Sequence, residues 1–299
     1  MSSVQPVRLP IAPSAPVRRF TWSWDWLGVA PFFAFAIAFL FIPAASIFIR
    51  SFQDSSGSPT LQNIFDLTQP FILSAFAVSI RLSLFTALLG CLIGGLMAYA
   101  ITLGNLPRVV RSSLSSFSGV AANFAGVPLA FAFIATLGRL GMVTDWLKWI
   151  GLDLYQSGFN IYTFWGLSFT YLYFQIPLAV LMLLPAFDGL KREWREAAEN
   201  LGGSTWDYWR YVGLPILAPS ILGTLILMFG NAFGAQATAF ALTGGQINLV
   251  SILIGAQISG DALQNPGLGN ALALGMVVVM ALSIAVYGWL QQRVSRWLQ

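Results

Sequence analysis

The chain has 299 residues, of which 57% are hydrophobic and only 9% are charged. Soluble globular domains carry about 25% charged residues, so this composition excludes an ordinary soluble protein and indicates a chain built to lie in a bilayer. With no histidine and a single cysteine, Cys91, an internal disulfide, His-dependent catalysis and the usual zinc sites are excluded. The net charge of +4 includes no basic run interleaved with aromatics, so nucleic acid is not an expected partner.

The first 20 residues are rich in Pro, Ser and Val, and the sequence predicts a flexible tail at 1–26. The apolar run after Trp26 is longer than the core of about 7–15 residues in a typical signal peptide, so we favour a retained tail over a cleaved one. Trp22, Trp24 and Trp26 fit an aromatic belt at a membrane interface.

Six stretches are uncharged and long enough to hold a spanning helix, which needs about 20 mostly apolar residues. In chain order they lie at 27–49, at 82–101 with an earlier start expected, within 112–138, within 154–187, at 214–236 and at 268–290. The sequence therefore predicts an all-α integral membrane protein with about six transmembrane helices. Segment 141–154 predicts an amphipathic helix at the outer interface, and 247–258 a re-entrant or interfacial piece rather than a seventh span. Arg81 is expected to extend to the interface.

An even number of spans places both termini on one side, and the positive-inside rule identifies that side as the cytoplasm. Eleven of the fifteen basic residues lie there, in the two tails and two of the loops: Arg8, Arg18, Arg19, Arg108, Arg111, Lys191, Arg192, Arg195, Arg210, Arg293 and Arg296. We therefore expect a multi-pass protein of a bacterial inner membrane, with a cytoplasmic tail at 1–26, a transmembrane domain at 27–292 and a cytoplasmic tail at 293–299.

The most polar stretch of the chain is the loop at 188–215, between the fourth and fifth spans. Its sequence predicts a helix as far as Leu201, a stop at Gly202, and a second helix opened by a capping box from Ser204 to Asp207. Ala197 and Ala198 lie between two carboxylates and give the first helix a small, flat face that permits close docking. A solvated loop and a partner-docking helix both fit this pattern.

The loop resembles the EAA signature of ABC-importer permease subunits, which is Glu-Ala-Ala, three residues, Gly, nine residues, Ile, any residue and Leu-Pro. Val212 replaces the Ile, and the other positions match: Glu196, Ala197, Ala198, Gly202, Leu214 and Pro215. The resemblance implies that these residues form a coupling helix that contacts a cytoplasmic ABC ATPase dimer. This chain lacks a G-x-x-x-x-G-K-[ST] phosphate loop, so we expect it to bind no cofactor and Mg-ATP to be held by the partner.

The first two spans and this loop together resemble permeases of the spermidine/putrescine type. That resemblance implies a second permease subunit, homologous or identical, and an extracytoplasmic substrate-binding protein. The implied substrate is a polyamine, with aminoalkylphosphonate, thiamine and ferric ion as alternatives. The outer loops would meet the binding protein through their acidic residues: Asp54, Asp66, Asp145 and Asp261.

Four uncharged polar residues fall within the spans and are candidates for the translocation path: Asn123, Gln175, Asn231 and Gln236. Interhelical hydrogen bonds are the competing interpretation. Pro128 and Pro177 can kink their helices and free carbonyls towards a cavity. Two small-x-x-x-small patterns, at 90–94 and 230–234, predict close helix packing.

Two other classes of protein fit the sequence less well. A self-sufficient secondary transporter or channel would be expected to show internal repeats or charged residues within the membrane for ion coupling, and neither is evident. An intramembrane protease is disfavoured because histidine is absent and Asp261 stands alone outside a span.

Overall fold

The computed structural model describes residues 26–54, 56–104, 106–259 and 265–295. Within these ranges the regular structure is helical, apart from an isolated bridge between Gln53 and Pro59. Six helical stretches are long and apolar enough to cross a membrane: Gly28–Ser51, Pro70–Leu103, Val127–Trp149, Phe164–Asp188, Thr205–Phe233 and Pro266–Arg293. The prediction of an all-α protein with about six transmembrane helices is confirmed. Trp22, Trp24 and Asp261 lie outside the described residues.

The chain divides into two compact units, Met1–Ser46 and Ile47–Gln299. The first unit contains α1 (Trp26–Ala36), the π-helical turn η1 (Ile37–Phe41) and the start of α2 (Ile42–Ser51). In the wide turn, the N–H of Ile42 bonds to the carbonyl of Ile37, and Pro43 follows at once. Because proline cannot donate to the preceding turn and crowds its carbonyl, a local widening of the helix accommodates it.

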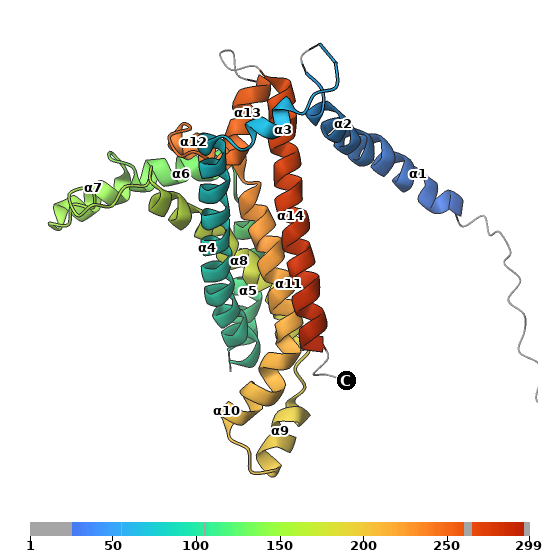
Figure 1. Cartoon of the computed structure of the whole chain (residues 1–299). Coiled ribbons are helices and arrows are strands. Elements are labelled where there is room, and N and C mark those ends of the chain that lie inside the picture. The colour runs from blue at the N-terminus through green and yellow to red at the C-terminus, as the bar shows by residue number, and fades with distance from the viewer. Residues whose placement is uncertain (1–25, 55, 105, 260–264, 296–299) are drawn as a thin grey trace, which may run out of the picture. The chain divides into compact units, whose positions relative to one another are not determined.

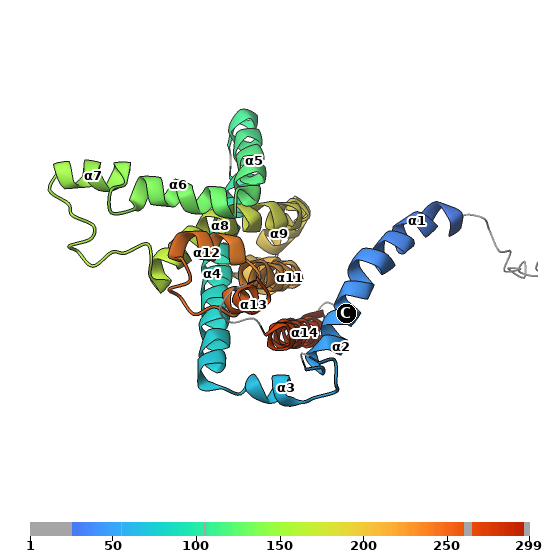
Figure 2. The ribbon, with the colours of Figure 1, turned by 90° about the horizontal axis from the view of Figure 1, so that it is seen from above.

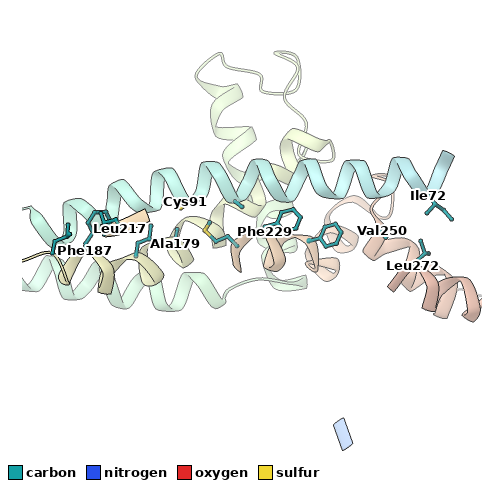
Figure 3. Close-up of a cluster of buried hydrophobic side chains, with 14 residues drawn as sticks. Ile72, Cys91, Ala179, Phe187, Leu217, Phe229, Val250 and Leu272 are labelled. Carbon is teal, nitrogen blue, oxygen red and sulfur yellow. The ribbon is translucent and has the colours of Figure 1, made fainter. Parts of the chain in front are cut away.

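In the second unit, four long helices lie side by side: α4 (Pro70–Leu103), α8 (Phe164–Asp188), α11 (Leu214–Phe233) and α14 (Pro266–Ser295), as Figure 1 shows. α8 packs against α4, against α11 and against α5 (Arg108–Asn123). Figure 3 shows the buried side chains of this core along the bundle, from Phe187 and Leu217 at one end to Ile72 and Leu272 at the other.

Glycines allow α4 to approach α8 closely. A Cβ at Gly94 would lie 2.6 Å from the Cβ of Ala179, and one at Gly90 would lie 3.0 Å from the Cβ of Gln175. In the other small-residue pattern, a Cβ at Gly230 would lie 2.6 Å from Cε of Met280 on α14. Both patterns therefore mark close helix contacts, as the sequence predicted.

α4 has 34 residues, so at about 1.5 Å per residue it is roughly 51 Å long, which exceeds the hydrocarbon thickness of about 30 Å. Arg81 is exposed on this helix and lies about 33 Å from its end at Leu103. If Leu103 marks one face of the bilayer, Arg81 reaches the other, as snorkelling would require.

The third predicted span differs from expectation because it is broken. α5 ends at Asn123 and α6 (Val127–Leu137) begins after a bend at 124–126. Gly126 has φ +76°, a conformation that favours glycine, and Pro128 occupies the first turn of α6, where its missing N–H matters least. α6 and α7 (Met142–Trp149) then run away from the bundle, across its long axis (Figures 1 and 2).

The two ends of the bundle carry different elements. The end of α14 and the start of α5 lie at the end from which α9 (Arg192–Asn200) and α10 (Thr205–Tyr208) project, as Figure 1 shows. The opposite end carries α3 (Gln62–Asp66), α12 (Gln236–Thr243) and α13 (Val250–Ser259). The segment expected to be re-entrant or interfacial is thus a short helix, and its depth in the membrane stays a prediction.

Candidate functional site

The projecting loop begins with the predicted helix, α9. Two ion pairs one turn apart lie on its surface, from Arg192 Nε to Glu196 Oε1 at 3.0 Å and from Arg195 Nε to Glu199 Oε1 at 2.9 Å. All four side chains are exposed, so each pair contributes only a few tenths of a kcal/mol to the helix. The charges keep α9 helical in water but leave its outer face free to bind.

α9 has two distinct faces. Trp194 is partly buried and packs on the core of the bundle, and Ala198, one turn later, is also partly buried. On the other side Glu196 and Ala197 are exposed, and at the C-terminal end of the helix the Leu201 side chain is 89% exposed. The structure thus places Ala198 nearer the bundle and adds Leu201, which sequence reasoning missed, to the exposed residues of α9 and its end. An apolar residue at the end of a charged helix was the available clue.

The turn after α9 is a Schellman motif. The N–H of Gly203 donates to the carbonyl of Ala198 at 2.9 Å, and that of Gly202 donates to Glu199 at 3.0 Å. Gly202 has φ +81° and no heavy atom within 4 Å of the position where a Cβ would lie. Its conformation, rather than a lack of space, therefore requires glycine there, and the predicted stop is confirmed.

The second helix opens with the predicted capping box. The N–H of Asp207 donates to Ser204 Oγ at 3.2 Å, and the N–H of Ser204 donates to Asp207 Oδ2 at 2.9 Å. α10 then passes through a π-helical turn, η2 (Trp209–Gly213), into α11. Like the turn before Ile42 and Pro43, this π-helical turn comes directly before an aliphatic residue and a proline, here Leu214 and Pro215. Leu214 is exposed and Pro215 is partly buried.

An aromatic cluster joins the loop to the bundle. The Trp209 ring lies 5.5 Å from the Tyr99 ring, which in turn lies 6.1 Å from the Phe187 ring, both in edge-on geometry. Since these rings come from η2, α4 and α8, the second half of the loop is fixed to the ends of two long helices. Such pairs add about 0.5–1.5 kcal/mol each beyond the apolar area that they bury.

A single ion pair links α5 to the last residue of α8. Arg111 Nη2 lies 2.5 Å from Asp188 Oδ1, and both side chains are about half exposed. α9 starts four residues after Asp188, so this pair joins the first turn of α5 to the base of the loop. The sequence placed both residues on one side of the membrane but gave no reason to pair them.

Of the four candidate path residues, Gln175 is fully buried. Its Nε2 donates to the carbonyl of Met228 on α11 at 3.0 Å, at the point where Gly90 of α4 approaches. This is the interhelical hydrogen bond that was the competing interpretation. Gln175 therefore joins helices in this structure and does not face an open surface.

The other three candidates are exposed and flank two helix breaks. Asn123 ends α5, Asn231 lies in the last turn of α11, and Gln236 begins α12 after a break at 234–235. The two breaks are in contact, because the N–H of Gly126 donates to Thr238 Oγ1 at 2.8 Å. The Tyr171 hydroxyl of α8 also donates to the carbonyl of Ala235 at 2.6 Å.

This meeting of two broken helices is a typical setting for solute contacts, because unwound backbone presents free polar groups at membrane depth. Thr238 and Tyr171 were missed from the sequence. A buried phenol in an apolar span needs a hydrogen-bond partner, which was the only clue to Tyr171.

Comparison with known proteins shows a family match over most of the second unit. Residues 98–296 match the family described as "Binding-protein-dependent transport system inner membrane component". This range includes both helix breaks and the whole loop from α9 to η2.

Curated relatives are similar over much of the chain. The sulfate transport system permease protein CysT of Synechococcus elongatus is 27% identical over 243 residues, which cover 80% of each chain. The thiamine transport system permease protein ThiP of Escherichia coli K12 is 29% identical over 167 residues, which are 56% of this chain and 30% of that one.

Solved structures share the fold. A chain of a bacterial ABC transporter involved in the import of the acidic polysaccharide alginate superposes with a TM-score of 0.70 at 19% identity, over 90% of this chain and 96% of that one. A chain of the MetNI methionine ABC transporter gives 0.53 at 15% identity, over 76% and 99%.

Proposed function

Because the chain belongs to the family of binding-protein-dependent transport system inner membrane components, we propose that it is the permease subunit of an ATP-driven ABC importer. It forms half of a translocation pathway for a small solute that an extracytoplasmic binding protein delivers. The observation that carries this proposal is the α9–α10 element, which projects from one end of the bundle with an exposed outer face (Figure 1).

The outer face of α9 is the docking site for the ATPase. Glu196 and Ala197 are exposed there, and Leu201, at the C-terminal end of the helix, offers apolar area that a partner would remove from water. Gly202 fixes the angle between the two halves of the element through the Schellman turn. Leu214 and Pro215 act differently, since they start α11 and transmit motion rather than contact the ATPase.

Movement of the docked helix reaches the pathway through two rigid attachments. The Trp209 cluster joins the loop to α4 and α8, and the Arg111–Asp188 pair joins its base to α5. Closure of the ATPase would therefore displace the ends of α8, α11 and α5 together. Asn123, Asn231 and Gln236, at the helix breaks, are the residues we place along the solute path.

The proposal requires several partners. A cytoplasmic ATPase dimer binds and hydrolyses Mg-ATP, and this chain binds no cofactor. A second permease, identical or homologous, supplies the other half of the pathway. In the first unit, the described side chains from Gly28 to Ser46 all remain at least partly exposed, which suits a helix that lies against lipid or a second permease.

The orientation follows from charge. Arg108, Lys191, Arg210 and Arg293 lie at the α9 end of the bundle, which the positive-inside rule assigns to the cytoplasm of a bacterial inner membrane. The opposite end, with Asp54 and α3, would then face the binding protein.

The relatives reduce the set of candidate substrates. The names of the two curated relatives described above refer to sulfate and thiamine transport, and neither name supports a polyamine as the substrate. Thiamine was already among the alternatives from the sequence. Sulfate and thiamine are therefore the first solutes to test, ahead of spermidine and putrescine.

Co-purification from the native membrane tests the proposal, using the wild type, Gly202→Asp and Gly57→Asp. Gly57 is a matched control, because it has φ +84°, open space around its Cβ position and a place at the opposite end of the bundle. We expect the wild type and Gly57→Asp to retain an ABC ATPase, and Gly202→Asp to lose most of it. A wild-type protein that purifies alone and moves solute in liposomes without ATP would instead support the secondary transporter.

A further inference from the structure

The hairpin between α6 and α8, residues 138–163, carries an apolar face that the described part of the chain leaves exposed. Met142, Trp146 and Trp149 follow helical spacing on α7 and are 72%, 62% and 84% exposed. On the opposite face Thr144 is buried. Although Val127–Trp149 is long and apolar enough to span, α6 and α7 run across the long axis of the bundle (Figures 1 and 2), so when the bundle spans a bilayer this face lies along the membrane surface.

Beside this face the hairpin forms a polar pocket of about 360 Å³. Arg139, Lys148, Asp153, Tyr155 and Asn160 contribute to its wall. The Arg139 guanidinium lies 5.8 Å from the centre of the Tyr155 ring, and the Tyr155 hydroxyl donates to the carbonyl of Leu137 at 3.0 Å. These contacts hold the cation and the ring in place at the mouth of the hairpin.

The charges around the pocket balance. Lys148 Nζ donates to the carbonyl of Arg139 at 3.4 Å and lies 3.7 Å from Asp145 Oδ1. Asp153 accepts two backbone N–H groups through one oxygen, from Tyr155 at 3.0 Å and from Gln156 at 3.2 Å. The wall itself carries two cations and Asp153, and Asp145 beside it offsets the charge of Lys148. Pocket and surroundings together therefore have no net charge, which suits a ligand that carries one charge of each sign.

We propose that hairpin 138–163 binds the headgroup of a zwitterionic phospholipid with a primary ammonium group, of the phosphatidylethanolamine class. The phosphate meets Arg139 and Lys148, the ammonium meets Asp153, and the tryptophan face of α7 lies among the acyl chains. This occupant accounts for the balanced charge, the exposed indoles and the direction of α7 together. An indole has an apolar body and a polar N–H, which suits the headgroup level of a bilayer. The inference stands apart from the coupling of the ATPase.

Native mass spectrometry of the full chain, released from nanodiscs of equal phosphatidylethanolamine and phosphatidylglycerol, tests the pocket. The variants are Arg139→Gln, Asp153→Asn and, as control, Arg50→Gln, which removes an exposed arginine from a different polar pocket. Asp153→Asn keeps an oxygen for both backbone N–H groups. We expect Arg139→Gln to lower retained phosphatidylethanolamine several-fold and Asp153→Asn to shift retention towards phosphatidylglycerol. Retained lipid that is the same in all four proteins would overturn the proposal.

A second measurement distinguishes lipid from protein on the apolar face. Cys91 is the single cysteine, so a fluorophore can be placed at Trp149→Cys in a Cys91→Ala background. Quenching by nitroxide-labelled lipid, with little quenching by iodide in water, is the expected result. Quenching by iodide that is relieved when a purified binding protein is added would assign the face to that protein and overturn the lipid site.

Discussion

At the scale of single residues, Leu201 and Gly202 do different work in the same turn. Gly202 is needed for its backbone conformation, because φ +81° costs a residue with a side chain about 1–2 kcal/mol. Leu201 is needed for its surface, because it is 89% exposed and contributes nothing to the core. A substitution at Leu201 should therefore separate binding of the ATPase from folding of the loop.

We predict that Leu201→Ser weakens ATPase binding about tenfold or more and leaves the thermal stability of the permease unchanged. Burial of a leucine side chain is worth about 1.5–3 kcal/mol, and each 1.4 kcal/mol is a factor of ten in affinity. Binding of the purified ATPase to the permease in nanodiscs measures this directly.

Leu61→Ser is the matched control, since Leu61 is 56% exposed beside α3 at the opposite end of the bundle. Equal affinities for all three proteins would show that the ATPase does not use this face of α9.

Local backbone chemistry was readable from the sequence at this scale. The stop at Gly202 and the capping box from Ser204 to Asp207 depend only on neighbouring residues, and both are present as expected. The pairing of Arg111 with Asp188 was not readable, because it depends on how α5 packs against α8 across 77 positions of chain. Exposure at Leu201 was likewise not readable, because it depends on how the end of α9 projects from the bundle.

At the scale of elements, the contact between the two helix breaks is the feature most directly tied to the solute path that we propose. The Gly126 N–H has its partner in Thr238, and the break in α5–α6 is thereby held to α12. Thr243, one and a half turns further along α12, is equally buried, yet its hydroxyl bonds to Ala239 within its own helix. The two threonines therefore allow a comparison between a hydroxyl that bonds to another element and a hydroxyl that bonds within its own helix.

We predict that Thr238→Val lowers the stability of the permease by about 1–3 kcal/mol and slows solute uptake, because it leaves a partly buried N–H without a partner. Thr238→Ser, which keeps the hydroxyl, should restore most of both. Thermal unfolding in detergent and ATP-driven uptake in proteoliposomes are the measurements. If Thr243→Val lowers stability and uptake as much as Thr238→Val does, the hydrogen bond between the breaks has no special part in transport.

The sequence predicted which long segments are helical, but it did not predict where a helix is interrupted. Uncharged length sufficed to find α4, α8, α11 and α14, because the bilayer requires long apolar helices. It failed between Asn123 and Val127, where the sequence remains apolar but the positive φ of Gly126 ends one helix and Pro128 begins another. Two of the four proposed path residues, Asn123 and Gln236, proved to lie at helix ends, while Gln175 is enclosed by its neighbours.

At the scale of the whole molecule, the proposed function makes this chain a lever and half of a solute path, with energy supplied by a partner ATPase. The α9–α10 element at one end is attached to the same helices, α8 and α11, that run towards the helix breaks at the other. The proposed function therefore depends on one external contact, between α9 and a cytoplasmic ATPase.

Photo-crosslinking from position 197 tests that contact most directly. Ala197 is exposed on α9, and replacement by p-benzoylphenylalanine leaves the ion pairs and the glycine turn in place. The same residue at Ser58, exposed at the opposite end, is the control. The account predicts an adduct with an ABC ATPase in native membranes from position 197 and none from position 58. A permease that still transports its solute, yet gives no ATPase adduct from position 197, would contradict it.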